Sequence, residues 1–201
     1  AQTDIYVAYW DGTTWSTPWR VDSGPRRTRS LAPSIVALGN MPVVVWQDHR
    51  NGQANADLYA ATWNGTVWSE QALVTTSGAQ TWPALVAINN QRAFLAWRDE
   101  RAGYAEIYGG FWSPQLTSGF AAQRLHGTPP RLPYQMTPAL AARGGRTYAM
   151  FADRQTGYQD FYLAQRTLSG TWQAPSPLPT GANQGVLIHH EATNLAFGSD
   201  G

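Results

Sequence analysis

Aspartate and arginine recur together at three places in this sequence. The pairs are Asp48 with Arg50, Asp99 with Arg101, and Asp153 with Arg154. The planar guanidinium of arginine binds a carboxylate through two parallel hydrogen bonds, so arginines that converge from separate segments could hold an acidic substrate. The structural alternative is that each Asp accepts turn amides and pairs with its Arg, which would staple a hairpin. Both interpretations are open from the sequence, and we favour the structural one because the pair returns in every repeat.

Trp82 is the second chemical signal. Eight of the ten tryptophans fall on positions that recur along the chain and are expected in the core, whereas Trp19 and Trp82 do not. Trp82 stands directly before Pro83, at a position that Ala32 and Thr137 occupy elsewhere. A flat, exposed ring can stack on the apolar face of a pyranose. The alternative is that Trp82 packs on a neighbouring loop.

Composition excludes several other kinds of site. There is no cysteine, so disulfides, thiol nucleophiles and Cys-ligated metals are impossible, and a net charge of +1 removes the electrostatic signature of a nucleic-acid binder. No apolar run approaches the roughly 18 residues of a membrane span. His189, His190 and Glu191 are metal-ligand types, but adjacent side chains on an extended segment point to opposite sides. We expect no cofactor and no metal, no nucleic-acid partner and no membrane span.

These residues belong to a chain that repeats itself. Residues 57–69 read almost letter for letter as residues 4–16. The recurring tyrosines at 6, 59, 108 and 162 are 53, 49 and 54 residues apart. A period near 50 residues with several short strands per unit is typical of propeller blades.

Each unit reads as four strands with no helical periodicity. In one unit we expect strands at 34–38, 42–46 and 57–63, and a fourth from residue 68. The dipeptides Asn64-Gly65 and Asp11-Gly12 suit tight hairpins. Runs such as 43–46 are apolar on both faces of the strand, as in a sheet held between two other sheets. The sequence therefore predicts an all-β fold, a β-propeller of four-stranded antiparallel blades of about 50 residues each.

Two motifs carry a family resemblance. The elements Trp-x-Asp-x-Arg-x-Gly, at 46–52, and Asp-Ile-Tyr, at 4–6, resemble those of bacterial extracellular propeller repeats of the TolB-like and sialidase-like kind. The resemblance implies an extracellular, cell-surface or periplasmic protein. In sialidases three arginines bind the substrate carboxylate; Arg50 and Arg101 match in register and Arg154 is displaced by one position. The sialidase Tyr–Glu pair is not singled out here, although Tyr134 and Glu191 fall on the expected face.

Three complete blades are expected between partial ones. The segments are 1–31 (strands three and four of a blade), 32–81, 82–136 and 137–191 (whole blades), and 192–201 (a first strand). The two ends could close a four-bladed ring. The alternative, which we favour, is a larger propeller whose remaining blades come from the same gene product or from a partner chain.

In a propeller, the loop from strand two to strand three opens on the same face as the loop to the next blade. The ligand-binding candidates on that face are Arg29, Gln80, Trp82, Tyr134, Gln135, His189 and Glu191. The basic stretch Arg26-Arg27-Thr28-Arg29 is either a solvated loop or a contact for an anionic glycan or partner.

Three functions fit these observations. The first and favoured one is a non-catalytic extracellular module that binds or assembles with a protein or a surface glycan. The second is a lectin-like propeller with Trp82 in a sugar site. The third is a sialidase-like glycoside hydrolase whose remaining catalytic residues lie outside this chain.

Overall fold

The computed structural model describes residues 2–25, 28–115, 120–125, 135–153, 160–178 and 195–196. Every regular element within these ranges is a β-strand, and three of the four sheets are four-stranded and antiparallel. The predicted all-β propeller class is confirmed. Among the described residues there is no helix with the length and apolar character needed to span a bilayer.

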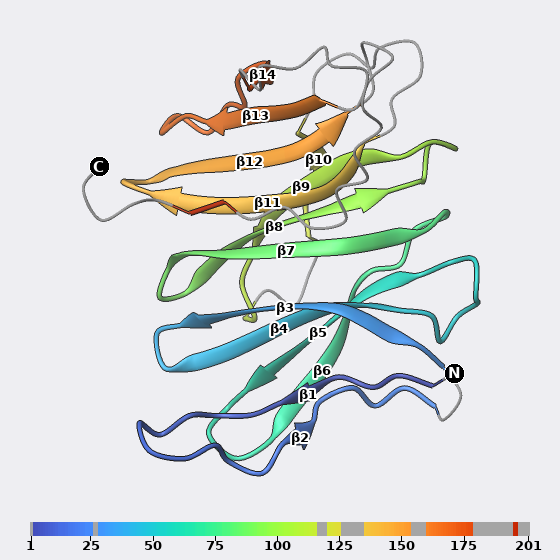
Figure 1. Ribbon diagram of the computed structural model, residues 1–201, viewed down its shortest axis with the longest axis vertical. Helices are drawn as coiled ribbons and strands as arrows, with labels where there is room; N and C mark the ends of the chain where they lie inside the picture. Colours follow the sequence, from blue (N-terminus) through green and yellow to red (C-terminus); the bar gives the residue numbers. More distant parts are fainter. Residues whose placement is uncertain are drawn as a thin grey trace.

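Consecutive strands form consecutive sheets (Figure 1). The N-terminal pair consists of β1 (Tyr6–Val7) and β2 (Trp19–Arg20). The first blade contains β3 (Ser30–Leu38), β4 (Met41–Asp48), β5 (Asp57–Trp63) and β6 (Trp68–Val74). The second blade contains β7 (Gln80–Asn89), β8 (Arg92–Asp99), β9 (Glu106–Trp112) and β10 (Gln123–Arg124). The third blade contains β11 (Met136–Arg143), β12 (Arg146–Asp153), β13 (Asp160–Arg166) and β14 (Ser176–Pro177).

The hairpin between β5 and β6 differs from the tight two-residue turn expected at Asn64-Gly65. Four residues, 64–67, separate the two strands. Only Gly65 takes a positive φ, at 99°, while the Asn64 side-chain oxygen accepts hydrogen bonds from the amides of Thr66 and Val67, both at 2.9 Å. The asparagine side chain thus closes the turn, so its own backbone needs no left-handed conformation.

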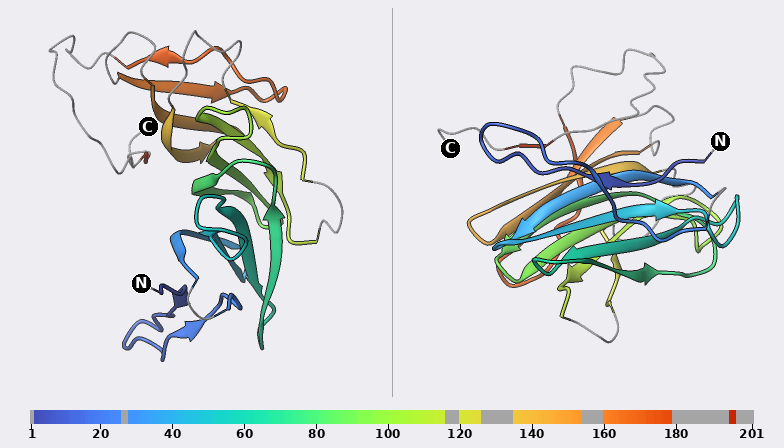
Figure 2. Two further views of the ribbon diagram at one scale, coloured as in Figure 1. Left: turned by 90° about the vertical axis from the view of Figure 1, so that its right-hand side faces the viewer. Right: turned by 90° about the horizontal axis from the view of Figure 1, so that it is seen from below.

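Apolar cores lie between neighbouring sheets. The central strands β4 and β8 are buried along most of their length, because each is covered on both faces. One cluster joins the first and second blades, another the second and third, and a smaller one, which includes Ile5 and Trp46, joins the N-terminal pair to the first blade. Figure 2 shows the sheets following an open arc, with the N-terminal pair at one end and the third blade at the other.

A repeated backbone contact fixes the spacing of the sheets. The amide at the start of each inner strand donates to the carbonyl just before the third strand of the preceding unit: Ser30 to Thr3 at 2.9 Å, Gln80 to Ala56 at 2.6 Å, and Gln135 to Ala105 at 3.1 Å. The N-terminal pair therefore sits where strands three and four of a complete blade would sit. The expected first strand at 192–201 falls on residues of which the structure describes only 195–196.

Candidate functional site

One edge of the array gathers the loops between strands two and three and the starts of the inner strands. We call this edge the funnel face; it comprises the ends of β4 and β8, residues 49–56 and 100–105, and the starts of β3, β7 and β11. Backbone hydrogen bonds tie its loops together, since the amide of His49 donates to the Arg29 carbonyl and the amide of Glu100 to the Ala79 carbonyl, both at 2.9 Å.

Each inner strand is irregular at the same place on this face. Ala32, Trp82 and Thr137 have positive φ angles of 49°, 54° and 24°, and each precedes a proline at a break in the strand ladder. A non-glycine residue held in this region costs on the order of 1–3 kcal/mol. Such a bulge turns a side chain away from the direction that regular pleating would give it. The backbone device is shared by the three blades, but the side chain it presents differs in each.

In the second blade the bulge presents Trp82, with 42% of its surface exposed. The Trp82 amide donates to the side-chain oxygen of Gln47 at 3.0 Å, across the boundary with the first blade. Gln47 is buried, and its amide nitrogen lies 3.5 Å from Nε2 of His49. The backbone that carries this half-exposed indole is thus held by a contact between two blades, and the exposed ring suits stacking on a flat apolar ligand surface.

Arg98 and Glu100 lie beside the same strand. An Arg98 Nη1 donates to Thr81 Oγ1 at 3.4 Å, and Nη2 forms a close ion pair with Glu100. The Glu100 side chain is partly exposed, so the funnel face offers a carboxylate and a guanidinium beside Thr81, the residue that precedes Trp82. Groups of this kind donate to and accept from sugar hydroxyls.

The recurring Asp48 and Arg50 are bound to each other. Arg50 Nε and Nη2 donate to the two Asp48 oxygens at 3.0 and 2.8 Å, and the Arg50 amide donates at 2.8 Å. Trp46 Nε1 adds a bond at 3.0 Å. Burial alone would raise the pKa of Asp48, but the hydrogen bonds from Arg50 and Trp46 outweigh it and lower that pKa. Burial disfavours the charged form of Arg50, yet Asp48 and Glu70 together raise its pKa.

The second blade repeats this arrangement. Arg101 Nε and Nη2 donate to Asp99 at 2.9 and 2.6 Å, and Trp97 Nε1 donates to Asp99 at 2.8 Å. The hydrogen bond to Asp99 raises the pKa of Arg101. In the third blade Asp153 accepts from Gln135 at 2.9 Å, while Arg154 lies outside the described residues. The Nε and Nη2 edge of each arginine is thus occupied by its own aspartate, so neither Arg50 nor Arg101 offers that edge to a substrate carboxylate.

Two predicted ligand contacts need correction. Gln80 and Gln135 are fully buried in the blade interfaces. The Gln80 amide nitrogen donates to the Gly78 carbonyl at 2.7 Å, and the Gln135 oxygen accepts from the Ile107 amide at 2.7 Å. Each side chain satisfies backbone groups inside the fold and so does not reach a ligand.

The remaining candidates are only partly placed. Arg29 is exposed on the funnel face. Arg26, Arg27, Tyr134, His189, His190 and Glu191 lie outside the described residues. Within the described ranges no three His, Cys, Asp or Glu side chains are grouped to hold a metal ion.

Sequence reasoning missed Gln47, Arg98 and Glu100. Gln47 and Arg98 occupy the variable position of the Trp-x-Asp motif, where Ala152 stands in the third blade. The sequence does indicate this position, because side chains alternate along a strand: the residue between Trp and Asp points to the opposite face of the sheet from its two neighbours. A repeat position that changes its residue type from blade to blade is a candidate for ligand contact.

Comparison with known proteins agrees on the architecture. No family model matches the sequence, and a search of curated proteins found no relative. Among solved structures, an α-L-arabinanase from Penicillium chrysogenum complexed with arabinobiose superimposes with a TM-score of 0.56 at 16% identity, covering 80% of this chain and 54% of that one. The α-L-arabinofuranosidase Arb93A from Fusarium graminearum gives 0.56 at 13% identity, over 77% and 50% of the two chains. A family 117 glycoside hydrolase from Zobellia galactanivorans gives 0.54 at 11%, over 87% and 61%.

These likenesses change the functional interpretation. The expected non-catalytic binding or assembly module is wrong as the leading hypothesis, because the similar structures are glycoside hydrolases and so favour the hydrolase alternative. At these identities the likeness establishes the β-propeller fold. The chain spans between 50% and 61% of the length of these structures.

Proposed function

We propose that this chain is part of a glycan-hydrolysing propeller that acts on α-L-arabinofuranosyl polysaccharide, and that its funnel face binds the sugar. The observation that carries the proposal is the half-exposed Trp82 ring on a strained backbone whose amide donates to Gln47, with Arg98 on the neighbouring strand and Glu100 in the loop after it. The substrate class is supported by the arabinanase and arabinofuranosidase structures that share the fold. A polysaccharide substrate also favours a location outside the cytoplasm.

Hydrolysis of a glycosidic bond requires two carboxyl groups that flank it. In the described part of the funnel face Asp48 and Asp99 are engaged by arginines, and Glu100 is paired with Arg98. The proposal therefore assigns sugar binding to Trp82, Arg98 and Glu100. The reacting carboxylates would come from residues outside the described ranges or from further blades, supplied by the same gene product or a partner chain.

The sialidase-like substrate site is a weaker basis for the proposal. It needs three arginines free to bind a carboxylate, and both Arg50 and Arg101 are taken up by Asp48 and Asp99. A neutral arabinosyl glycan makes no such demand. An aryl sialoside is therefore the comparison substrate in the test below.

The test combines binding and hydrolysis. The chain is titrated with arabino-oligosaccharides and incubated with linear arabinan, an aryl α-L-arabinofuranoside and an aryl sialoside. Trp82→Ala should weaken oligosaccharide binding by about tenfold, the loss expected for one stacked ring. Trp19→Ala is the matched control, since Trp19 is 41% exposed but lies on the N-terminal pair. Sugar binding without product release by the complete gene product, further blades included, would support the lectin-like alternative. No binding, or equal losses in the two variants, would contradict the proposal.

A further inference from the structure

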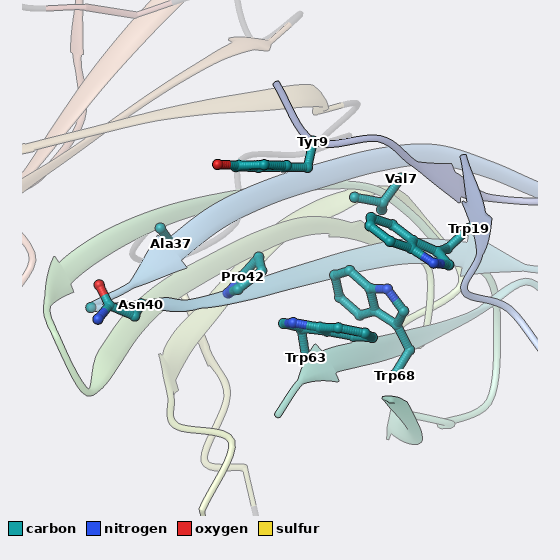
Figure 3. Close-up of a pocket in the computed structure, with 9 residues that line it drawn as sticks. Val7, Tyr9, Trp19, Ala37, Asn40, Pro42, Trp63 and Trp68 are labelled. Carbon is teal, nitrogen blue, oxygen red and sulfur yellow. The ribbon is translucent and has the colours of Figure 1, made fainter. Parts of the chain in front are cut away.

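A groove of about 490 Å³ lies between the N-terminal pair and the first blade. Figure 3 shows four aromatic side chains along its walls: Trp19 comes from β2, Tyr9 from the segment after β1, and Trp63 and Trp68 from the first blade. The Trp63 ring centroid is 5.7 Å from that of Trp19 and 5.6 Å from that of Trp68. Such a large exposed aromatic surface is uncommon on a soluble protein unless something covers it.

The same place between the first and second blades is filled. Leu38, Val43 and Val45, from the first and second strands of the first blade, pack there against Trp97 and Trp112 of the second blade. Trp112 is the repeat equivalent of Trp63 and is buried, whereas Trp63 is half-buried at the groove. The groove is thus the space that the first and second strands of a blade normally occupy.

Exposure at equivalent positions supports this comparison. Ile35 on β3 is 52% exposed, whereas its equivalent Leu85 on β7 is 8% exposed, because Leu85 faces the complete first blade. Tyr6 on β1 is 58% exposed, whereas its equivalents Tyr108 and Tyr162 are buried. Burial of these apolar side chains by an added sheet edge would be favourable.

The tyrosines equivalent to Tyr6 in the complete blades show which groups normally cover this ring. Tyr59 stacks on Trp46 with centroids 6.4 Å apart, and the Arg50 guanidinium lies 3.9 Å from the Tyr59 centroid. In the second blade the Trp97 and Tyr108 ring centroids are 6.3 Å apart, and the Arg101 guanidinium lies 4.4 Å from the Tyr108 centroid. In both blades the ring and the arginine come from the second strand and the loop after it. In the described residues β1 has β2 as its one strand neighbour, so its other edge is open to such a strand.

We propose that this groove and the free edge of β1 form the seat of a β-hairpin of the same repeat type, supplied by polypeptide outside these 201 residues. The hairpin carries apolar side chains at the positions of Leu38, Val43 and Val45. Its second strand pairs with β1 and ends in aromatic-x-Asp-x-Arg, which covers Tyr6. The inference does not depend on the proposed function.

Two other occupants fit less well. A second copy of the chain holds its own first and second strands within complete sheets, where β4, β8 and β12 each pair on both sides. A saccharide would have the Asn40 amide, the Tyr9 hydroxyl and indole N–H groups as partners, but no charged side chain is among the groove's lining residues, and no carboxylate or guanidinium is there to bind sugar hydroxyls.

The experiment supplies the hairpin within the chain. A copy of residues 30–56 is joined directly ahead of Asp4, because 57–69 and 4–16 are equivalent and the copy then ends where the repeat requires. The copy carries Trp46→Phe, as Phe151 stands there in the third blade, so the graft adds no tryptophan. Completion of the blade should raise Tm by about 5 °C or more and shift tryptophan emission to shorter wavelength, with less quenching by acrylamide. The matched control graft carries Val43→Asp and Val45→Asp in the copy and should give neither change.

Three results would overturn the proposal. One is equal Tm and emission for the two grafts. Another is a dimer of the ungrafted chain in which tryptophan is already protected and which Trp19→Ala dissociates. The third is saturable binding of arabino-oligosaccharides that Trp19→Ala abolishes and Trp82→Ala leaves intact, which would make the groove a sugar site. Loss of sugar binding in Trp82→Ala alone bears on the proposed function and leaves the hairpin seat untouched.

Discussion

Replacement of Arg50 by alanine should destabilise the fold without weakening sugar binding. Arg50 donates two side-chain hydrogen bonds to the buried Asp48, pairs with Glu70 at 2.6 Å and covers the Tyr59 ring. In Arg50→Ala, Asp48 keeps the amide of residue 50, the Trp46 indole and the Ser30 hydroxyl as donors. Removing one partner of a buried pair costs about 3–5 kcal/mol, and the remaining donors place the expected loss near 3 kcal/mol.

Arg101→Ala is the comparison for the loss of stability in Arg50→Ala. Arg101 makes the same two bonds to Asp99 but is more exposed, and among the described residues it has no second carboxylate partner equivalent to Glu70. Its removal should therefore cost less, about 2 kcal/mol. Urea unfolding followed by tryptophan fluorescence measures both values, and Arg50→Lys separates the planar fork from the charge.

Three results would refute this reasoning. A loss below about 1 kcal/mol for Arg50→Ala would mean that the pair is a weak surface contact. A larger loss for Arg101→Ala than for Arg50→Ala would contradict the contribution of Glu70. A folded Arg50→Ala protein with sugar affinity reduced by more than about tenfold would place the guanidinium in a substrate site.

Further predictions concern pH, the support of Trp82 and the loop glycines. The folded-state pKa of Asp48 lies below its ordinary value of 3.8, so the stability that Asp48 contributes is complete above that pH and is lost as pH falls through the folded-state pKa. In urea titrations at pH 2–5, Asp48→Asn should therefore show a smaller loss of unfolding free energy with acidification than the wild type. Gln47→Leu removes the acceptor of the Trp82 amide and should weaken arabino-oligosaccharide binding by about threefold in titrations; unchanged affinity would show that the Trp82 amide needs no such acceptor. Gly78→Ala, with φ +77° and a new Cβ 2.6 Å from the Glu100 carbonyl, should cost about 3 kcal/mol or more. Gly12→Ala at φ +100° meets nothing within 4 Å and should cost about 1 kcal/mol; equal thermal shifts for the two variants would contradict the clash.

Strand positions were largely predictable because the repeat shows which features are common to all blades. The strand expected at 57–63 is β5 as observed, and the fourth strand begins at Trp68 as expected. The inner strand begins at Ser30 instead of residue 34, since the chain passes through Pro33 by a bulge. Proline normally marks a strand end or an edge, so the sequence alone pointed to a start after it.

The candidate site was less predictable, because loop position indicates a face but not burial. Gln80 and Gln135 were placed on the correct edge, yet they turn into the blade interface to satisfy backbone groups there. Trp82 was singled out because its repeat position carries different residues in other blades, and its role in sugar binding stays a prediction. Gln47 lies on β4 of the first blade and Trp82 on β7 of the second, and only the three-dimensional arrangement brings them together.

The recurring amide-to-carbonyl contacts from Ser30, Gln80 and Gln135 also determine how the array responds to gain or loss of a unit. Each blade is attached to its neighbours alone, so the total stability approximates a sum of single-blade and nearest-neighbour terms. Duplication or deletion of one unit changes that sum by one blade and one interface and leaves the other blades folded. The middle blade contacts a neighbour on both sides, so the outer units are expected to unfold first when the array is destabilised. Propeller size can thus change during evolution in whole-blade steps, without redesign of the blades that carry a ligand site.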